Sequence, residues 1–210
     1  MAPPKLDISG WFECLCDQPI TDYGHQAYGH DGCYALIWPE RRQGNLADMT
    51  TRLVQIGKCA RIAPAQPGQA IQTSDWLCGV LSQKRDQFIR QIQALGGHWQ
   101  ISFIFKTPVL REPTANATIR ERHSYLQNLR RSLETANAPL KPFLSDIKSS
   151  IVAVTAPQQS GLGRAKRHIL VERAQLNRVL DRWVEQFQRD AKASVVGPLP
   201  PFAFAKAVIA

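Results

Sequence analysis

Short apolar segments alternate along the first half of the chain with stretches of helical spacing. Residues 8–16 and 33–38 are apolar and bounded by turn residues, which is typical of β-strands, and residues 59–63 form a shorter strand candidate. Residues 17–32 are rich in glycine, which indicates a loop. In residues 99–106 every second side chain is apolar, so this segment is predicted to be a strand with one buried face.

Two helices are predicted between these strands. Residues 46–56 place apolar side chains at helical spacing, and Gly57 follows them. Residues 74–95 carry the strongest helical pattern of the first half, with Thr73 or Ser74 as the N-cap. The pattern is interrupted by three charged residues at 84–86. Strand, helix, strand, helix, strand within about a hundred residues is typical of a small α/β sandwich.

The second half has its own series of elements. A helix is expected from about Pro113 to Pro139, because both ends carry helix-boundary signals. Beyond it the pattern predicts, in order, a strand at 147–155, a loop at 157–166, a strand at 168–171, a helix at about 172–190 and a strand at 193–196. Helix, strand, strand, helix, strand is most of a ferredoxin-like module.

A proline-rich segment ends the chain. Pro198, Pro200 and Pro201 lack amide protons and fix φ near −65°, so an extended, polyproline-like arm is predicted after residue 196. In such an arm Phe202 and Phe204 lie on the same side. A stiff arm that ends in two aromatic side chains loses little entropy when it docks, so it is suited to brace the fold.

We therefore expect an α+β protein of two small ferredoxin-like α/β-sandwich domains with an extended Pro-rich C-terminal tail. The expected boundaries are 1–107 for the N-terminal α+β domain, 108–196 for the C-terminal ferredoxin-like domain, and 197–210 for the Pro/aromatic tail.

Composition adds three constraints. No apolar run approaches the roughly 20 residues that span a bilayer, and no signal-peptide core follows the N-terminus, so a cytoplasmic protein is expected. The 5 cysteines, an odd number, fit reduced thiols. The net charge of +9 is concentrated in the second half, because residues 108–210 carry 16 Lys/Arg against 8 Asp/Glu. Such a half is suited to an acidic partner surface or to nucleic acid, or it serves solubility alone.

The first half contains one cluster of possible metal ligands: Cys14, Cys16, His25, His30 and Cys33. Zinc prefers four nitrogen or sulfur ligands, and a loop between strands is able to supply them. The spacing matches no common zinc motif, and Cys14 and Cys16 would share one face of a strand, where buried thiols also lie. We therefore favour core cysteines and expect no metal and no cofactor; the alternative is a metal- or thiol-dependent enzyme.

Two basic features of the second half have alternative interpretations. Gly161–Arg167 resembles a phosphate loop only superficially, since it lacks Gly-Lys-Ser/Thr and lies between two strands. Seven helical arginines form a candidate nucleic-acid stripe without interleaved exposed aromatics: Arg120, Arg122, Arg130, Arg131, Arg173, Arg178 and Arg182.

The C-terminal sequence Gly197-Pro198-Leu199-Pro200-Pro201-Phe202-Ala203-Phe204 resembles the Gly-Pro-x-Pro-Pro-aromatic-x-Phe signature of the gas-vesicle GvpF/GvpL family. Weaker resemblances come in the same order as in that family. They are the Pro-containing loop at 61–68 before a Ser-Asp helix start, the strand after Gly96-Gly97, and the strand at 165–171. Together they cover about residues 58–206.

The resemblance implies a function and a set of structural residues. It implies a non-enzymatic accessory or minor structural protein, cytoplasmic and at the gas vesicle. Such a protein binds the hydrophobic shell protein and other accessory proteins during assembly. The tail residues Gly197, Pro198, Pro200, Pro201, Phe202 and Phe204 would be structural, with no catalytic residue and no small-molecule substrate. The alternative, from charge alone, is a basic nucleic-acid-binding module.

Overall fold

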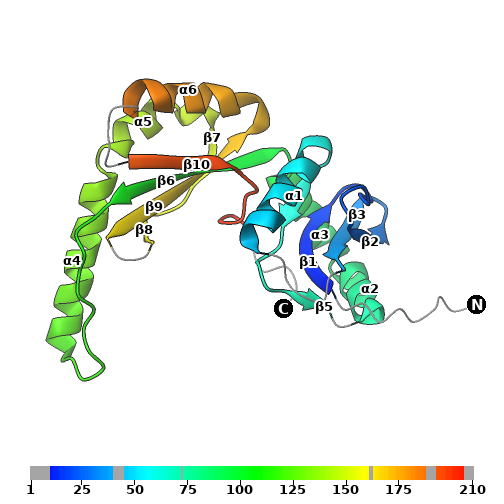
Figure 1. Cartoon of the computed structure of the whole chain (residues 1–210), viewed down its shortest axis with the longest axis horizontal. Helices are drawn as coiled ribbons and strands as arrows, with labels where there is room; N and C mark the ends of the chain where they lie inside the picture. The colour runs from blue at the N-terminus through cyan, green and yellow to red at the C-terminus, as the bar shows by residue number, and fades with distance from the viewer. Residues whose placement is uncertain (1–9, 40–44, 72, 161–162, 188–192, 206–210) are drawn as a thin grey trace, which may run out of the picture. The chain divides into compact units, whose positions relative to one another are not determined.

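Two antiparallel sheets organise the chain, each with helices packed on it (Figure 1). The structure is a computed structural model and describes residues 10–39, 45–71, 73–160, 163–187 and 193–205. The chain divides into two compact units. The first contains the residues up to His98 together with those from Leu199 onward, and the second contains Trp99–Pro198.

The sheet of the first unit has the order β2-β3-β1-β4, and β5 also pairs with β1. Its strands are β1 Gly10–Cys16, β2 Gln26–His30, β3 Cys33–Trp38, β4 Ile62–Pro64 and β5 Ala70–Ile71. The central strand β1 pairs antiparallel with β3, and the register shifts between Phe12 and Cys14. This β-bulge leaves Glu13 without an opposite residue in the ladder.

Strand β2 lies inside the segment expected to be a loop, so that expectation was wrong for residues 26–30. It forms a hairpin with β3 in which His30 pairs with Cys33. Asp31 and Gly32 between them both have positive φ, 48° and 77°, as a tight two-residue hairpin turn requires. The Asp-Gly pair is therefore the sequence signal that identifies this hairpin.

Three helices belong to the first unit: α1 Leu46–Cys59, α2 Ser74–Gln83 and α3 Arg85–Leu95. Asn45 and Thr73 cap α1 and α2 with their side chains. The single helix expected over residues 74–95 is broken at Lys84, whose φ and ψ are −107° and 15°. The buried apolar residues of this segment stop at Leu81 and resume at Phe88, and the break lies in the charged run 84–86 between them.

The first unit has three strands before its first helix among its described residues. The element order of a ferredoxin-like module begins strand, helix, strand, so the first unit does not follow it. The reason is the β2–β3 hairpin, in which β2 adds a strand where a loop was expected, before the expected strand β3. One core cluster lies between this sheet and α1 and contains Cys14, Cys16, Leu36, Met49, Leu53, Ile56, Ala60 and Ile62.

The second unit has the element order strand, helix, strand, strand, helix, strand. Its main elements are β6 His98–Lys106, α4 Ile119–Asn137, α5 Leu140–Asp146, β7 Ile151–Val154, β9 Arg164–Glu172, α6 Leu176–Phe187 and β10 Ala193–Leu199. The sheet order is β10-β6-β9-β7, and the short β8 Gln158–Gln159 also pairs with β9.

Strand β6 was expected to complete the first domain, and this placement was wrong. It lies in the second sheet, between β10 and β9. Alternating apolar residues identify the buried face of a strand, but they do not identify the sheet. The partners of β6 lie far along the chain, and their pairing decides where it belongs.

Other boundaries of the second unit also differ from expectation. The first helix begins at Ile119, where Thr118 and Glu121 form a reciprocal capping box. Helix α5 was not predicted, and its residues Leu140 and Phe143 are buried. Strand β9 begins at Arg164, inside the expected loop. None of the helices that the structure describes has both the length and the apolar character of a membrane span.

The core of the second unit is an aromatic cluster between the sheet and its helices. The rings of Trp183 and Phe187 stack with centroids 4.3 Å apart, and Phe143 meets both edge-on. Phe103 of β6 lies 4.6 Å from Trp183, centroid to centroid. These contacts join β6, α5 and α6 through one set of side chains.

Phe143→Ala is predicted to destabilise the protein by about 3–5 kcal/mol, since the side chain is fully buried and its loss leaves a cavity. Urea denaturation followed by circular dichroism measures the change. Val184→Ala on α6 is the control, because Val184 is 47% exposed and its loss should have little effect. Equal unfolding free energies for Phe143→Ala and the wild type would contradict the assignment of this core.

Candidate functional site

The first part of the predicted tail motif belongs to a strand. Gly197 and Pro198 lie in β10, which continues to Leu199 instead of ending at residue 196. This strand is at the edge of its sheet, where a proline without an amide proton is tolerated. A side chain at position 197 would lie 3.0 Å from the Gln100 carbonyl oxygen on β6, so glycine permits the close approach of these two strands.

After Leu199 the chain turns, so the expectation of an extended arm was wrong. The amide of Phe202 donates to the Pro200 carbonyl at 2.7 Å, and the amides of Phe204 and Ala205 donate to the Pro201 carbonyl at 3.0 and 3.1 Å. The φ that proline imposes suits a turn as well as an extended chain. Nearby carbonyl acceptors for these amides favour the turn here.

The turn is packed on the first unit, to which it belongs. Pro200 and Pro201 are buried, and the half-buried Phe202 packs against the core cluster between α1 and the first sheet. Phe204 lines a shallow hollow beside α3, and Gln66 donates a hydrogen bond to the Ala205 carbonyl at 3.3 Å. Residues 206–210 of the predicted tail lie outside the described residues. The terminus, as far as Ala205, is thus an integrated part of this unit.

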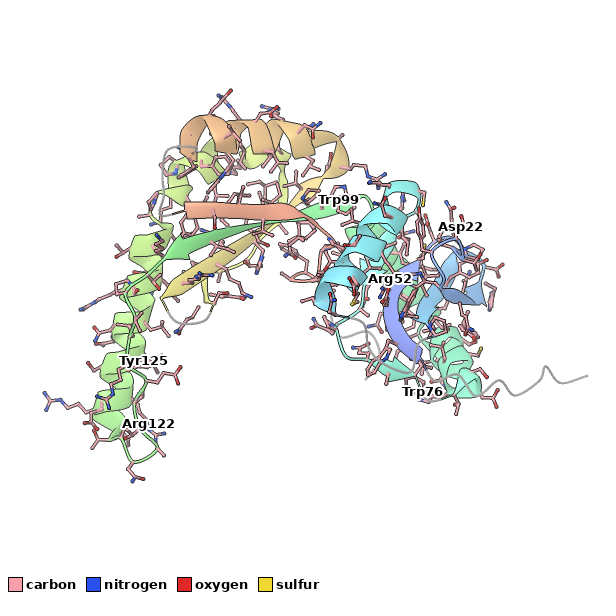
Figure 2. The ribbon with its side chains drawn as sticks, in the orientation of Figure 1. Asp22, Arg52, Trp76, Trp99, Arg122 and Tyr125 are labelled. Carbon is pink, nitrogen blue, oxygen red and sulfur yellow. The ribbon has the colours of Figure 1, made fainter. Side chains whose placement is uncertain are left out.

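A buried ionic cluster lies in the same unit and was not predicted. The Glu13 carboxylate, at the β-bulge, is hydrogen-bonded to His25 Nε2 at 2.7 Å and accepts hydrogen bonds from the Arg52 guanidinium of α1. The guanidinium carbon of Arg52 lies 3.9 Å from the centroid of a Trp38 ring, and the His25 ring meets Trp38 edge-on. Figure 2 marks Arg52 on its helix. The bulge explains how a carboxylate on the central strand reaches a helix.

Two opposing effects act on the pKa of Glu13. Burial raises the pKa of this carboxyl group, but hydrogen bonds and charge from His25 and Arg52 outweigh that effect and lower it below the ordinary value. The carboxylate therefore remains charged at neutral pH inside the fold. A buried charge with two partners fixes the position of α1 against the sheet and strongly disfavours the loss of either partner.

The five residues proposed as metal ligands are not brought together. Cys14 and Cys16 are fully buried in the core cluster, and burial raises the pKa of Cys14 and raises the pKa of Cys16 to about 11. His25 is bonded to Glu13, while His30 is exposed and bonded to Asp31. Within the described ranges, no three His, Cys, Asp or Glu side chains are arranged to hold a metal ion.

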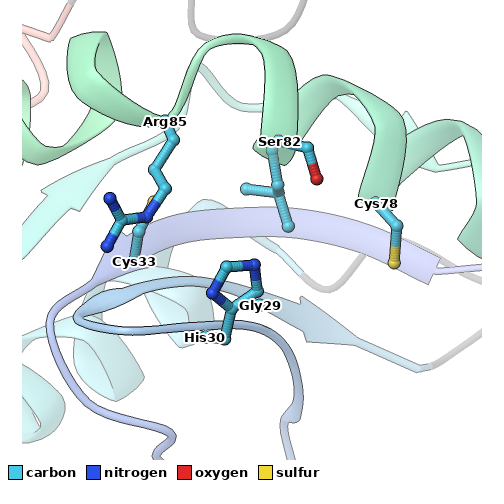
Figure 3. A pocket seen from close by; sticks show the side chains of 7 residues that line it. Gly29, His30, Cys33, Cys78, Ser82 and Arg85 are labelled. Atoms are coloured by element: carbon cyan, nitrogen blue, oxygen red, sulfur yellow. The ribbon is translucent and has the colours of Figure 1, made fainter.

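Cys33 lines a small hollow between the β2–β3 hairpin and α2–α3 (Figure 3). Burial raises the pKa of its thiol, although Arg85 nearby acts in the opposite direction. Arg85 itself donates to the Asp31 carbonyl at 3.0 Å. The hollow encloses about 50 Å³, far below the roughly 300–1,000 Å³ of typical ligand pockets, so it has room for a few water molecules and not for a substrate.

A serine and a histidine are paired in the second unit. Ser102 Oγ lies 2.8 Å from His168 Nδ1, and the Gln100 side-chain amide contacts both. Burial lowers the pKa of His168, which keeps the ring neutral at pH 7. Ser102 and His168 are only 5% and 7% exposed, so this pair is a satisfied buried polar group without access for a substrate.

The helical arginines do not form one free stripe. Arg122 on α4 (Figure 2) donates to the carbonyls of Ala115 and Ala117 in the segment that precedes its helix. Arg130 pairs with Glu134, and Arg182 pairs with Asp146 and Glu185. In the predicted loop, Gly161 and Leu162 lie outside the described residues, and the chain continues from Gly163 into β9, not into a helix.

Phe202→Ala is predicted to lower the unfolding free energy by about 1–2 kcal/mol, because full burial of a phenylalanine contributes about 1.5–3 kcal/mol and Phe202 is partly buried. Thermal and urea denaturation measure the effect, with Ala203→Ser at an exposed position of the same turn as the control. A Phe202→Ala protein as stable as the control would show that the turn contributes nothing to the unit.

Glu13→Gln is predicted to cost about 3 kcal/mol at pH 7, since it leaves the partly buried Arg52 without its anionic partner. The folded pKa of Glu13 is lowered, so its stabilisation is complete above the ordinary value of 4.5 and is lost as the pH falls below it. Urea denaturation between pH 7 and pH 3 should therefore show the wild type approaching the variant. Glu134→Gln, in an exposed pair, is the control. A gap between wild type and Glu13→Gln that does not change with pH would contradict this account.

Comparison of the sequence with protein-family models gives no match, and comparison with curated proteins gives none either. Comparison of the structure with solved structures gives clear matches. The crystal structure of gas vesicle protein GvpF from Microcystis aeruginosa superposes with a TM-score of 0.68 at 13% identity, covering 95% of this chain and 99% of that one. That of GvpF from Anabaena sp. PCC7120 gives a TM-score of 0.64 at 15% identity, covering 94% and 96%.

The match extends over nearly the whole of both chains, so it includes both units and their order. The C-terminal motif, a sequence feature, resembles that of the GvpF/GvpL family and so agrees with the structural superposition. This chain has the GvpF fold.

Proposed function

We propose that this protein is a non-enzymatic accessory or minor structural protein of gas vesicles, which acts in the cytoplasm where the vesicles form. In this proposal it binds the hydrophobic shell protein and other accessory proteins during assembly. The observation that supports it most is the shared fold with two GvpF proteins along about 95% of the chain. The Gly-Pro-x-Pro-Pro-aromatic-x-Phe sequence of the tail adds to it.

The polar clusters of both units support a binding role over a catalytic one. The Ser102–His168 pair is buried, and the hollow beside Cys33 is too small for a substrate. The Glu13 carboxylate is held by two partners and serves the packing of α1. Each of these groups has a structural role that accounts for it.

The tail motif has a structural role in this proposal. Gly197 and Pro198 lie in β10, an edge strand of the second sheet, and the turn at Pro200–Ala205 packs on the first unit. The chain thus passes from one unit to the other twice, at His98–Trp99 and at Pro198–Leu199. We propose that the docked turn is a latch that keeps both units in one folded protein, and that the second unit is a ferredoxin-like module.

Partner binding in this proposal uses apolar and basic surface. The second unit carries 16 Lys/Arg against 8 Asp/Glu between residues 99 and 198, and its helix α4 exposes Ile119 and Leu126. A basic surface attracts an acidic partner, and exposed apolar side chains provide contact area. Contacts of this kind keep an aggregation-prone shell subunit apart from its copies until it is added to the vesicle.

Co-expression with the shell protein of a gas-vesicle gene cluster tests the function. The wild type should keep the shell protein in the soluble fraction and co-purify with it. Removal of residues 200–210 should reduce co-purification at least about tenfold, while Ala203→Ser should not. No co-purification with the wild type would contradict the proposal. Steeply salt-dependent binding to random duplex DNA in its place would favour the nucleic-acid alternative.

A further inference from the structure

Among the described residues, the longer edge strands of the two sheets are β2, β4, β10 and β7, and the two-residue strands β5 and β8 also lie at edges. Three of the four longer strands carry features that hinder pairing with another strand. β4 ends in Pro64, and β10 contains Pro198, neither of which has an amide proton. β2 contains Gly29 with a φ of +132° and ends in the exposed polar residue His30. Prolines, irregular backbone and polar side chains are the usual protection of exposed sheet edges.

The fourth longer edge strand, β7, has one irregularity, a register shift between Ile151 and Ala153 in its pairing with β9, and beyond that shift Ala153 and Val154 pair in regular register. Its sequence, Ile-Val-Ala-Val, has no proline, glycine or charge. Val152 and Val154 are 50% and 39% exposed, while the intervening residue and Ile151 are turned toward the protein. In the part of the chain that the structure describes, β7 pairs only with β9.

The backbone groups of Val154 in β7 are directed toward the outer side of the strand. The Thr155 amide donates to the His168 carbonyl of β9 at 2.9 Å, so residue 155 directs its backbone groups toward β9. Backbone groups of successive residues in a strand point to opposite sides, and Val154 pairs in register with Ile169. The N–H and C=O of Val154 therefore point away from the sheet, at the edge where its side chain is also exposed.

We propose that the outer edge of β7 is a docking site for an extended apolar segment of an acidic partner protein, which adds to the second sheet as a further strand. Backbone hydrogen bonds along β7 provide the affinity, and small apolar side chains at every second position of the segment contact Val152 and Val154.

Charge selects this partner over a second copy of the chain. The second unit has a net charge of +8, because residues 99–198 carry 16 Lys/Arg and 8 Asp/Glu. Lys148 precedes β7 by three residues, and Arg167 donates to the Thr155 carbonyl just after the strand. Two copies paired through β7 would bring these like charges together, whereas a segment with acidic flanks complements them.

Docking at the β7 edge is not part of the proposed function and does not depend on gas vesicles. It concerns the chemistry of the β7 edge and is tested with a synthetic probe. A failed shell-protein pull-down would leave it standing, and failure of the probe would leave the proposed function standing.

The probe is a fluorophore-labelled synthetic peptide of alternating valine and threonine with two glutamates at each end. Fluorescence anisotropy should show binding to the full chain, and weaker binding of the same peptide with lysine in place of glutamate. Val154→Pro removes the outward amide without removing a bond to β9 and should weaken binding about tenfold or more. Val154→Thr keeps the amide and is the matched control, with binding close to that of the wild type.

Hydrogen exchange of the wild type gives a second readout that needs no variant. The Val154 amide should exchange rapidly in the free protein and become protected with the glutamate peptide, whereas the Thr155 amide should be protected in both states. Absence of peptide binding, equal binding to Val154→Pro and the wild type, or no new protection at Val154 would each overturn the proposal. Sedimentation that shows a dimer lost in Val154→Pro would assign the edge to a second copy and overturn it as well.

Discussion

The packing of Phe202 against the core cluster between α1 and the first sheet is the contact on which the organisation of the chain depends. It places the last residues in the same compact unit as the first 98, although the strand just before them, β10, is part of the second sheet. The chain therefore begins and ends in the first unit and builds the second unit between two crossings. Burial of Pro200 and Pro201 and the turn hydrogen bonds around them hold Phe202 in place. The C-terminal segment therefore carries the sequence motif and also stabilises the first unit by its packing.

Two polar clusters inside the fold join side chains from different elements and stabilise the packing. The β-bulge at Glu13 directs a carboxylate toward Arg52, and the Arg52–Trp38 contact continues the same cluster across the helix–sheet interface. In the second unit, Ser102, Gln100 and His168 satisfy one another on neighbouring strands. Both clusters resemble catalytic groupings by residue type, but Glu13, His25, Ser102 and His168 are buried and hydrogen-bonded to neighbours within their clusters, as in structural polar clusters.

The sequence pattern predicted most elements and failed where partners lie far apart. Helices α1 and α6 and strands β1, β3 and β6 follow from hydrophobic spacing, because their buried faces are local properties. The placement of β6 in the second sheet depends on pairing with β9 and β10, and spacing contains no information about that. The break at Lys84 follows from a run of charges that the pattern already showed, and the β2–β3 turn from Asp31-Gly32, a signal that was present and unused. At the site, the tail residues were identified but not their turn. The Glu13–Arg52 pair had no local signal, since 39 residues separate its members.

The likeness to GvpF concerns the fold of the chain. The role of the tail motif in that fold depends on the packing of Phe202 against the core cluster, and this contact can be measured. Nuclear Overhauser contacts between the Phe202 ring and methyl groups of the core cluster report directly on whether the terminus is folded on the first unit; the methyl-bearing residues of that cluster are Leu36, Met49, Leu53, Ile56, Ala60 and Ile62. The account predicts such contacts in the free protein at neutral pH, with Phe202 ring signals shifted from those of an unfolded chain. Random-coil shifts for Phe202 and no contact to these methyl groups would contradict it.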